Sequence, residues 1–293
     1  MSWNNNNRGS SYVSSKEFVP FCQPDYYTPM GNAYNGYVDI KITCCTDIYI
    51  GSGFAYMPEN SKQLVYQTMM YDEKPVIPGS SLKGVVRNIA SAASNSCLPD
   101  IKDNNGARYP DWIKNIRCNA EKNCIVCDIF GTMGKGSKVM FSDLHSDNAK
   151  LVVRELNEQY SPKIYTEKDG TAKGYKFYKT GKNDYNMSKI KAQVVAKGAV
   201  FTGRIHFKKL TEEELSLLMF SLGLDDSEGT EIHLKIGGFK NEGIGEVAVN
   251  IIEFNCSGEM KKAVGELAFQ YYNMKTANQE AIDKIYDVLG IEE

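Results

Sequence analysis

The segment IPGSSLKGVVR, residues 77–87, is the stretch around which the rest of this chain can be placed. Pro78 and Gly79 interrupt the extended run before them, and the apolar residues after them recur at helical spacing. Ser80 and Ser81 can cap the exposed amides of a helix start. The pattern therefore predicts a turn followed by a helix that begins near Ser81.

The start of this helix is also a potential anion site. Its unpaired N–H groups carry a partial positive charge, and the basic residues Lys83 and Arg87 follow directly. Capped helices with nearby basic residues are common, so a phosphate-binding role has to be supported by other segments.

Composition sets the broad class of the protein. The chain has 293 residues, 42% of them hydrophobic and 24% charged, which is enough to bury a substantial core. A net charge of −2 does not indicate a nucleic-acid-binding protein, so such a function would depend on local charge. The polar start and the lack of a long apolar run predict a cytoplasmic protein with no membrane partner.

The order of the predicted elements is that of an α+β fold. The predicted strands cover residues 37–45, 138–144, 199–210, 231–236 and 246–254. One helix follows the first strand, and a capping box at Thr211 begins another after the third. This order is typical of a ferredoxin-like domain, the platform of RNA-recognition modules, with both helices on one face of an antiparallel sheet.

The domain organisation follows from composition along the chain. We expect a flexible, asparagine-rich arm over residues 1–16, one domain over residues 17–255, and a helical tail over residues 256–293. Two insertions interrupt the domain, one at residues 97–127 and one at about residues 150–197.

The first insertion has the cysteine spacing of a metal site. Cys118, Cys124 and Cys127 are close enough in sequence for one tetrahedral zinc, which needs a fourth ligand. Cys97, which lies in the same insertion, is the preferred fourth ligand, and His145 after the next strand is the alternative. The insertion has little core of its own, so a structural zinc would stabilise it, whereas no nearby Glu-His pattern indicates a catalytic one. The simpler alternative is three reduced cysteines in a loop.

The second insertion is rich in lysine and tyrosine. Residues 163–197 contain nine lysines against three acidic residues, interleaved with aromatic side chains. Lysines suit a phosphate chain and tyrosines suit stacking on bases. The alternative is a solvated, mobile insertion whose tyrosines cover the core.

Five segments in this order resemble the repeat-associated RAMP superfamily, the RNA-binding subunits of type III CRISPR effector complexes. They are residues 77–87, CDIFG at 127–131 followed by VMFSD at 139–143, KGYKFY at 173–178, FTG at 201–203 with Leu215, and GGFKNEGIG at 237–245. Together they span roughly residues 17–255, and five ordered motifs are more specific than any one.

The resemblance implies a backbone subunit with a modified ferredoxin-like (RRM-like) palm and an inserted thumb. Such subunits stack along a CRISPR RNA, hold a short stretch of the guide, and wedge the thumb, here residues 163–197, into the guide–target duplex. The implied partners are CRISPR RNA, complementary target RNA and other effector subunits. The implied RNA-binding residues are Gly79, Ser80, Ser81, Lys83, Arg87, Lys173, Lys176, Tyr178, Lys179, Gly237, Gly238, Lys240, Asn241 and Gly243.

The sequence does not decide whether the protein cleaves RNA. Slicing members of the superfamily cut target RNA with an aspartate in the loop after the first strand, and residues 51–70 contain none. Glu59 is the only acid there and is a weak catalytic alternative, which would need Mg²⁺. Three hypotheses follow: a guide-RNA scaffold, a target-RNA endonuclease of the same family, and a zinc-stapled protein-interaction module.

Overall fold

The structure is a computed structural model of the whole chain. It describes residues 16–59, 61–98, 107–114, 116–159, 165–179, 188–224, 230–258 and 260–292. The expected arm at residues 1–16 lies outside these ranges except for Lys16.

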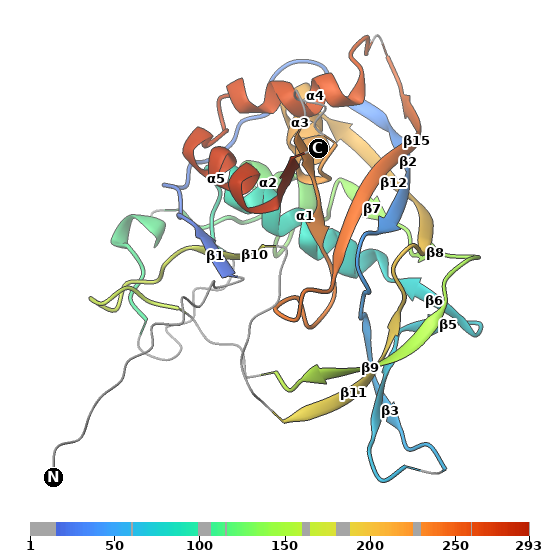
Figure 1. Cartoon of the computed structure of the whole chain (residues 1–293). Helices are drawn as coiled ribbons and strands as arrows, with labels where there is room; N and C mark the ends of the chain where they lie inside the picture. Colours follow the sequence, from blue (N-terminus) through green and yellow to red (C-terminus); the bar gives the residue numbers. More distant parts are fainter. Residues whose placement is uncertain are drawn as a thin grey trace, which may run out of the picture.

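A large antiparallel sheet forms the body of the molecule (Figure 1). Its three long strands are β2 (Tyr34–Cys44), β12 (Val200–Leu210) and β15 (Glu246–Cys256). Side chains alternate along a strand, and on β2 the apolar residues Val38, Ile40 and Ile42 point into the core. The shorter strands are β5 (Met70–Tyr71), β6 (Lys74–Ile77), β7 (Val139–Phe141), β8 (Leu144–His145) and β14 (Leu234–Lys235).

The helices gather over one face of this sheet (Figure 1). Helix α1 (Gly79–Ala93) packs against α3 (Glu212–Ser221), and α4 (Val264–Gln270) and α5 (Gln279–Leu289) extend the layer. The capping box that the sequence predicts at Thr211 is present, with Glu214 as its partner. The short helices are α2 (Ile125–Phe130) and the 3₁₀ turns Asp111–Lys114 and Tyr271–Asn273.

The predicted α+β class is confirmed, because helices pack on sheets that are mostly antiparallel. The order β15–β2–β12 continues to β7, with α1 between β2 and β7 in sequence and α3 between β12 and β15. The predicted strand at residues 231–236 is divided. Its first part, β13 (Thr230–Ile232), pairs with β16 (Gly290–Glu292), and its second part is β14, which pairs with β15.

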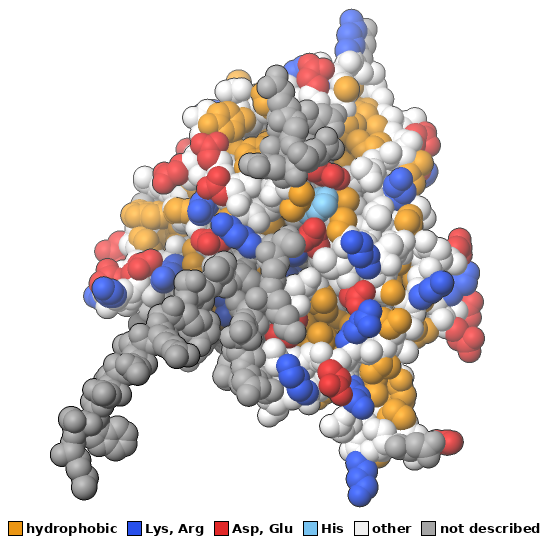
Figure 2. Space-filling model, viewed as in Figure 1, with side chains coloured by type: hydrophobic (Ala, Val, Ile, Leu, Met, Phe, Trp, Pro, Cys, Tyr) orange, Lys and Arg blue, Asp and Glu red, His pale blue; other side chains and the backbone are white. Residues whose placement is uncertain are grey.

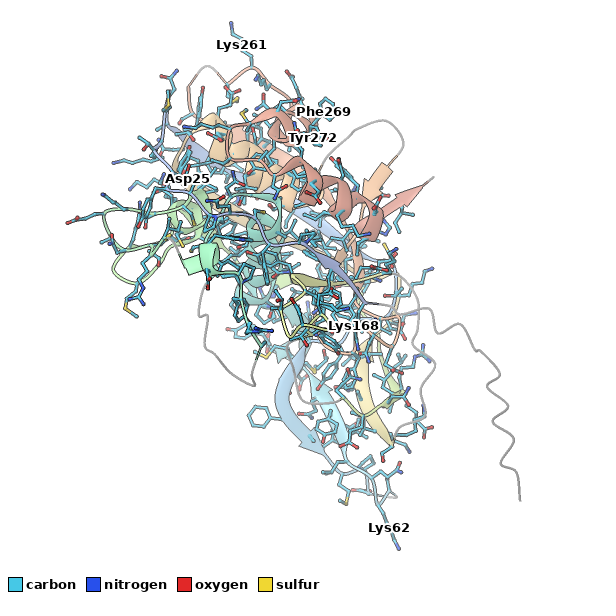
Figure 3. The ribbon with its side chains drawn as sticks, turned by 90° about the vertical axis from the view of Figure 1, so that its left-hand side faces the viewer. Asp25, Lys62, Lys168, Lys261, Phe269 and Tyr272 are labelled. Atoms are coloured by element: carbon cyan, nitrogen blue, oxygen red, sulfur yellow. The ribbon has the colours of Figure 1, made fainter. Side chains whose placement is uncertain are left out.

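The second predicted insertion separates into two parts. Strands β9 (Leu151–Asn157) and β11 (Lys189–Val195) join β3 (Gly51–Tyr56) and β4 (Val65–Thr68) in a second sheet. The β3–β4 hairpin projects from the body, with Lys62 at its far end (Figure 3).

The other part, β10 (Tyr175–Tyr178), pairs with β1 (Lys16–Val19) and lies beside α5. Residues 160–164 and 180–187 of this insertion are outside the described ranges.

Two local expectations need correction. Helix α1 begins at Gly79 rather than near Ser81, and no serine side chain caps it. The carboxylate of Asp143 accepts a hydrogen bond from the Gly79 N–H at 2.8 Å instead. A Cβ on Gly79 would lie 2.2 Å from the carbonyl oxygen of Phe141, so this glycine allows close packing against the chain after β7.

The second difference is α2, which the sequence analysis placed at the end of an irregular insertion. All six residues of α2 are buried. A helix of fewer than two turns shows no apolar period, so the sequence pattern gave no signal for it. In the part of the chain that is described, no helix combines the length and apolarity needed to cross a bilayer.

Candidate functional site

A pocket of about 390 Å³ lies where α1, β10, the loop after β14 and α5 meet. Its volume is within the range of ligand sites, roughly 300–1,000 Å³. The lining residues are Ser81, Gly84, Val85, Asn88, Ile89, Lys176, Phe177, Tyr178, Lys235, Gly237, Lys240 and Leu289. Three segments that the sequence analysis assigned to RNA binding therefore meet at one pocket.

Helix α1 supplies one wall. Ser81, Val85 and Asn88 follow one another at helical spacing along the side of α1 that faces the pocket. Gly84 lies on the same side, and a Cβ there would meet no atom within 4 Å, so the missing side chain leaves space in the pocket. Asn88 was missed by the sequence analysis, although its spacing from Ser81 could have identified it.

The basic residues of α1 lie on a different side of the helix. The Arg87 guanidinium donates to the sulfur of Cys127 at 3.8 Å, and Lys83 is not among the residues that line the pocket. Burial, and then the charge of Arg87, lower the pKa of Lys83. The structure thus places Lys83 and Arg87 outside the pocket lining, and the Asp143 carboxylate accepts the hydrogen bond of the Gly79 amide at the helix start.

Strand β10 supplies the second wall. Tyr175 is buried in the core on one side of the strand, while Lys176 and Tyr178 line the pocket on the other. The Lys176 ammonium lies over two aromatic rings, 5.2 Å from the centroid of Tyr178 and 5.4 Å from that of Tyr165. These cation–π contacts hold the charge beside a ring that could stack on a base.

The neighbouring lysines of β10 have other partners. Lys173 lies 3.8 Å from the carboxylate of Glu167, and Lys179 lies 3.6 Å from that of Glu17. Neither lines the pocket, so the structure separates the three lysines that the sequence analysis grouped together.

The glycine-rich loop supplies the third wall. Gly237 has φ +81°, and a Cβ on it would lie 2.1 Å from the carbonyl oxygen of Tyr49. Gly238 donates its N–H to the same oxygen at 2.8 Å. The glycines therefore let this loop pack against the end of the Tyr49 segment, and they place Lys240 at the pocket.

The remaining predicted RNA-binding residues do not line the pocket. Gly79, Ser80, Gly238, Asn241 and Gly243 lie in the segments that shape it. Asn241 is buried, and the Gly243 N–H donates to the Lys240 carbonyl at 3.4 Å. Two further lining residues, Lys235 on β14 and Leu289 on α5, carry no motif that the sequence could have revealed.

The pocket is electropositive. Of its three lining lysines, Lys235 is paired with the Glu246 carboxylate at 2.7 Å, so Lys176 and Lys240 supply the positive charge, and no carboxylate among the described residues lines the pocket. The Lys240 ammonium donates to the Gly237 carbonyl at 2.6 Å, and burial followed by the charge of Lys176 lowers the pKa of Lys240 to about 8. An anion in the pocket would reverse this effect. Elsewhere, basic and acidic side chains are interspersed on the face in Figure 2, so this concentration of positive charge is local.

A cluster of four cysteines lies beside α1. Cys124 and Cys127 belong to the start of α2, Cys118 to the loop before it, and Cys97 to the chain after α1. Their sulfur atoms all lie within 4.8 Å of one another. The Cys97 sulfur is 3.5 Å from that of Cys127 and 3.7 Å from that of Cys124. Sulfurs bound tetrahedrally at about 2.3 Å from zinc would lie roughly 3.8 Å apart, so the cluster is positioned to bind a metal ion.

The surroundings of the cluster suit thiolates. The Cys124 amide donates to the Cys118 sulfur at 3.2 Å, and the Cys127 amide donates to the Cys124 sulfur at 3.5 Å. Arg87 adds a positive charge at Cys127. Four thiolates with one divalent ion carry a net charge of about −2, which these donors and Arg87 partly offset. His145, the alternative fourth ligand, is on β8 with its ring against Tyr71, outside the cluster.

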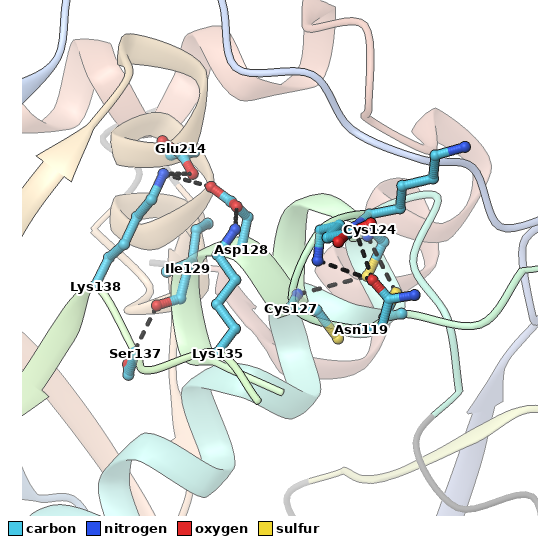
Figure 4. A network of polar contacts seen from close by, with 12 residues as sticks. Asn119, Cys124, Cys127, Asp128, Ile129, Lys135, Ser137, Lys138 and Glu214 are labelled. Atoms are coloured by element: carbon cyan, nitrogen blue, oxygen red, sulfur yellow. Dashed lines mark hydrogen bonds and ion pairs between the residues drawn. The ribbon is translucent and has the colours of Figure 1, made fainter. Parts of the chain in front are cut away.

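A buried ionic network anchors α2 next to this cluster (Figure 4). Asp128, one residue after Cys127, pairs with both Lys135 and Lys138. Lys138 also lies 2.7 Å from the carboxylate of Glu214 on α3. Removing one partner from such a buried network leaves an uncompensated charge and lowers the stability of the fold. The network therefore holds α2, and with it the cysteine cluster, against the core.

The weak catalytic alternative, Glu59, lies apart from these features. It is exposed in the turn that follows β3, on the projecting hairpin. Among the described side chains, it belongs to no group of three or more His, Cys, Asp or Glu that could hold a metal ion.

The family model described as RAMPs, RAMP superfamily, matches residues 41–248, more than two thirds of the chain. The chain belongs to the RAMP superfamily. The matched range includes three walls of the pocket and all four clustered cysteines, whereas Leu289 on α5 lies beyond it. No curated protein matches the chain.

Proposed function

We propose that this RAMP-superfamily chain is a CRISPR-RNA-binding backbone subunit of a type III or related effector complex, acting in the cytoplasm. The observation that carries the proposal is the pocket, where α1, β10 and the glycine-rich loop converge around Lys176 and Lys240. These segments are far apart in sequence and the family resemblance implies an RNA-binding role for each of them, so their meeting at one pocket supports one common ligand.

The ligand in this proposal is the phosphate backbone of the guide. Lys176 and Lys240 supply positive charge, and Gly84 leaves room for the RNA chain to approach. Tyr178 offers an aromatic face for an adjacent base. A phosphate in the pocket favours the charged form of Lys240, so above about pH 8 RNA binding is coupled to proton uptake.

The finer parts of the fold belong to the same proposal. The strand order β15–β2–β12–β7 with its two crossing helices supports a ferredoxin-like palm. The parts of residues 150–197 that the structure describes form β9, β10 and β11, of which β10 faces the pocket; we assign the insertion as the thumb that contacts the guide–target duplex.

We also propose zinc as the ion of the cysteine cluster. Four sulfurs at these separations are the donor set that Zn²⁺ prefers in closed structural sites, and Cys97, Cys118, Cys124 and Cys127 would hold it. When bound, zinc supplies a cross-link between the chain after α1 and the start of α2. The chain's own residues then keep α1, and with it one wall of the pocket, in place.

We assign a scaffold role rather than target cleavage. Metal-assisted cleavage needs carboxylates fixed beside the scissile phosphate, and Glu59 is exposed on the hairpin without such companions in the described structure. Target RNA and neighbouring subunits remain the expected partners in the assembled complex.

The test is to co-express the full chain with a CRISPR array and the other effector subunits and to sequence the RNA that co-purifies. Repeat-derived ends are expected, and Lys176→Ala with Lys240→Ala should reduce RNA recovery, whereas Lys208→Ala, an exposed lysine on β12, should not. Absence of co-purified RNA together with no gel shift at low salt would overturn the proposal in favour of a protein-interaction module.

Cleavage is tested on the assembled complex with complementary RNA and Mg²⁺. Intact target RNA is expected. Cutting that disappears in Glu59→Ala would overturn the scaffold assignment and establish the endonuclease alternative.

A further inference from the structure

A second set of metal-type ligands lies at the edge of the main sheet. Cys45 directly follows β2, His233 separates β13 from β14, and Glu246 begins β15. One ligand atom from each residue lies within 4.8 Å of the other two. None of these residues belongs to the four-cysteine cluster, so this group is a separate feature of the fold.

The backbone fixes Cys45 and Glu246 side by side. The Cys45 N–H donates to the Glu246 carbonyl at 2.9 Å, and the Glu246 N–H donates to the hydroxyl of Thr46 at 2.9 Å. The backbone N–H of His233 donates to the carbonyl of Leu289 at 3.0 Å, which fixes the third ligand against the end of α5. The ligands are therefore preorganised by three elements that are distant in sequence.

The histidine ring is oriented as in protein metal sites. Its Nδ1 lies 2.9 Å from Glu246 Oε1, while its Nε2 lies 3.3 Å from Glu231 Oε2 on the other side. Metal-ligating histidines usually donate their second ring N–H to a carboxylate, which fixes the ring and strengthens the ligand. Glu231 is in that position, so Nδ1 is the nitrogen directed at the group.

The site is enclosed but not sealed. The side chain of His233 is 12% exposed and that of Glu246 is 8% exposed. The other carboxylate oxygen of Glu246, Oε2, is paired with Lys235 at 2.7 Å, which leaves Oε1 on the side of His233. An ion could thus enter from solvent and meet three donors of different chemistry.

We propose that Cys45, His233 and Glu246 form a second metal site, for a divalent transition-metal ion such as Zn²⁺. Thiolate and imidazole ligands favour such ions over Mg²⁺ or Ca²⁺, which prefer all-oxygen sites. Ligands of a tetrahedral zinc lie roughly 3.3–3.8 Å apart, so the ion would replace the 2.9 Å hydrogen bond between His233 Nδ1 and Glu246 Oε1, and the Cys45 sulfur, within 4.8 Å of both, would complete the group. Three protein ligands leave a fourth position open to water.

The experiment uses Co²⁺ as the probe on the full chain. The protein is first loaded with one equivalent of zinc, which fills the four-cysteine cluster because four thiolates bind it most tightly. Further titration with Co²⁺ should then show about one saturable equivalent, with the visible absorption of a single thiolate ligand. Cys45→Ser and His233→Gln should abolish that equivalent, and Cys256→Ser, a partly exposed cysteine at the far end of β15, should retain it.

Glu231→Gln provides a milder test, because it leaves all three ligands in place. Loss of the carboxylate behind His233 should weaken Co²⁺ binding roughly 10–100-fold without abolishing it. The proposal is overturned if the zinc-loaded wild-type chain takes up no further Co²⁺, or if uptake is the same in Cys45→Ser. If Cys45→Ser does not fold, the wild-type metal content decides, since one metal ion per chain rather than two would also overturn it.

Discussion

Lys240 offers the sharpest test of the pocket, because its charge is unfavourable in the free protein and favourable in the complex. Its pKa falls from an ordinary value of 10.5 to about 8, first through burial and then through the charge of Lys176. We expect Lys240→Met, which keeps the length of the side chain and removes its charge, to stabilise the free protein and to weaken RNA binding.

The magnitude follows from linkage between protonation and folding. A pKa of about 8 instead of 10.5 means that a charged Lys240 costs the folded state about 3 kcal/mol at neutral pH. As pH falls from 10.5, the unfolded chain protonates Lys240 before the folded chain does. The free energy of unfolding therefore decreases between pH 10.5 and about 8 and stays at that lower level at more acidic pH. Subtracting about 1 kcal/mol for the lost hydrogen bond to Gly237 leaves a net gain of about 2 kcal/mol at pH 7.

The assay is urea unfolding of wild type and Lys240→Met at pH 7 and pH 10.5. The variant should be more stable at pH 7 and about 1 kcal/mol less stable at pH 10.5, where only the lost hydrogen bond counts. Lys208→Met, at an exposed position of β12, is the matched control and should change stability little at either pH.

The same group makes RNA binding depend on pH. At pH 9 Lys240 is largely neutral in the free protein, so binding must first charge it. The affinity for an RNA that contains only adenine and cytosine should therefore fall about tenfold between pH 7 and pH 9. In Lys240→Met the affinity should not depend on pH over this range. A variant that is less stable than wild type at pH 7, or a wild-type affinity that does not change with pH, would refute the assignment of Lys240 as a buried, unneutralised cation.

Three further changes test the pocket and the cysteine cluster. Lys176→Ala should weaken RNA binding and reduce the salt slope by about 1, whereas Lys41→Ala on the exposed side of β2 should leave both unchanged; gel shifts at several salt concentrations measure this. Gly84→Ala should raise the unfolding free energy by roughly 0.5–1 kcal/mol, because a helical glycine is replaced, yet should weaken RNA binding by placing a methyl group in the pocket. Equal RNA affinity would contradict that geometry. Cys124→Ser should lose one bound metal and more than about 4 kcal/mol of stability, as judged by metal analysis and urea unfolding, while Cys256→Ser should lose neither.

The sequence predicted most of what is local. The periodic stripe after Pro78 predicts α1, the capping box at Thr211 predicts α3, and the spacing of Cys118, Cys124 and Cys127 indicates three members of the metal cluster. These signals depend on residues within one or two turns of each other. Such patterns are readable without knowing what packs against them.

The parts that the sequence did not predict depend on distant partners. Asp143 replaces the serines at the start of α1 because Gly79 packs tightly on the chain after β7. The lysines of the second insertion divide between pocket and ion pairs because β10 pairs with β1, which is about 160 residues earlier in the chain. No local pattern reports a strand partner at that distance. The pocket lysine Lys235 was missed for the same reason.

The distribution of the pocket walls along the chain has a consequence for biosynthesis. Ser81 is made early, Lys176 and Lys240 follow in turn, and Leu289 on α5 completes the lining. A chain whose α5 has not yet left the ribosome therefore lacks the part of the pocket lining that Leu289 supplies. Domains generally fold as units during synthesis, so the pocket forms only after α5 is free to pack. Nascent chains of this protein contain α1 before the pocket is complete, so under the proposed function guide RNA would bind only chains whose synthesis has passed Leu289.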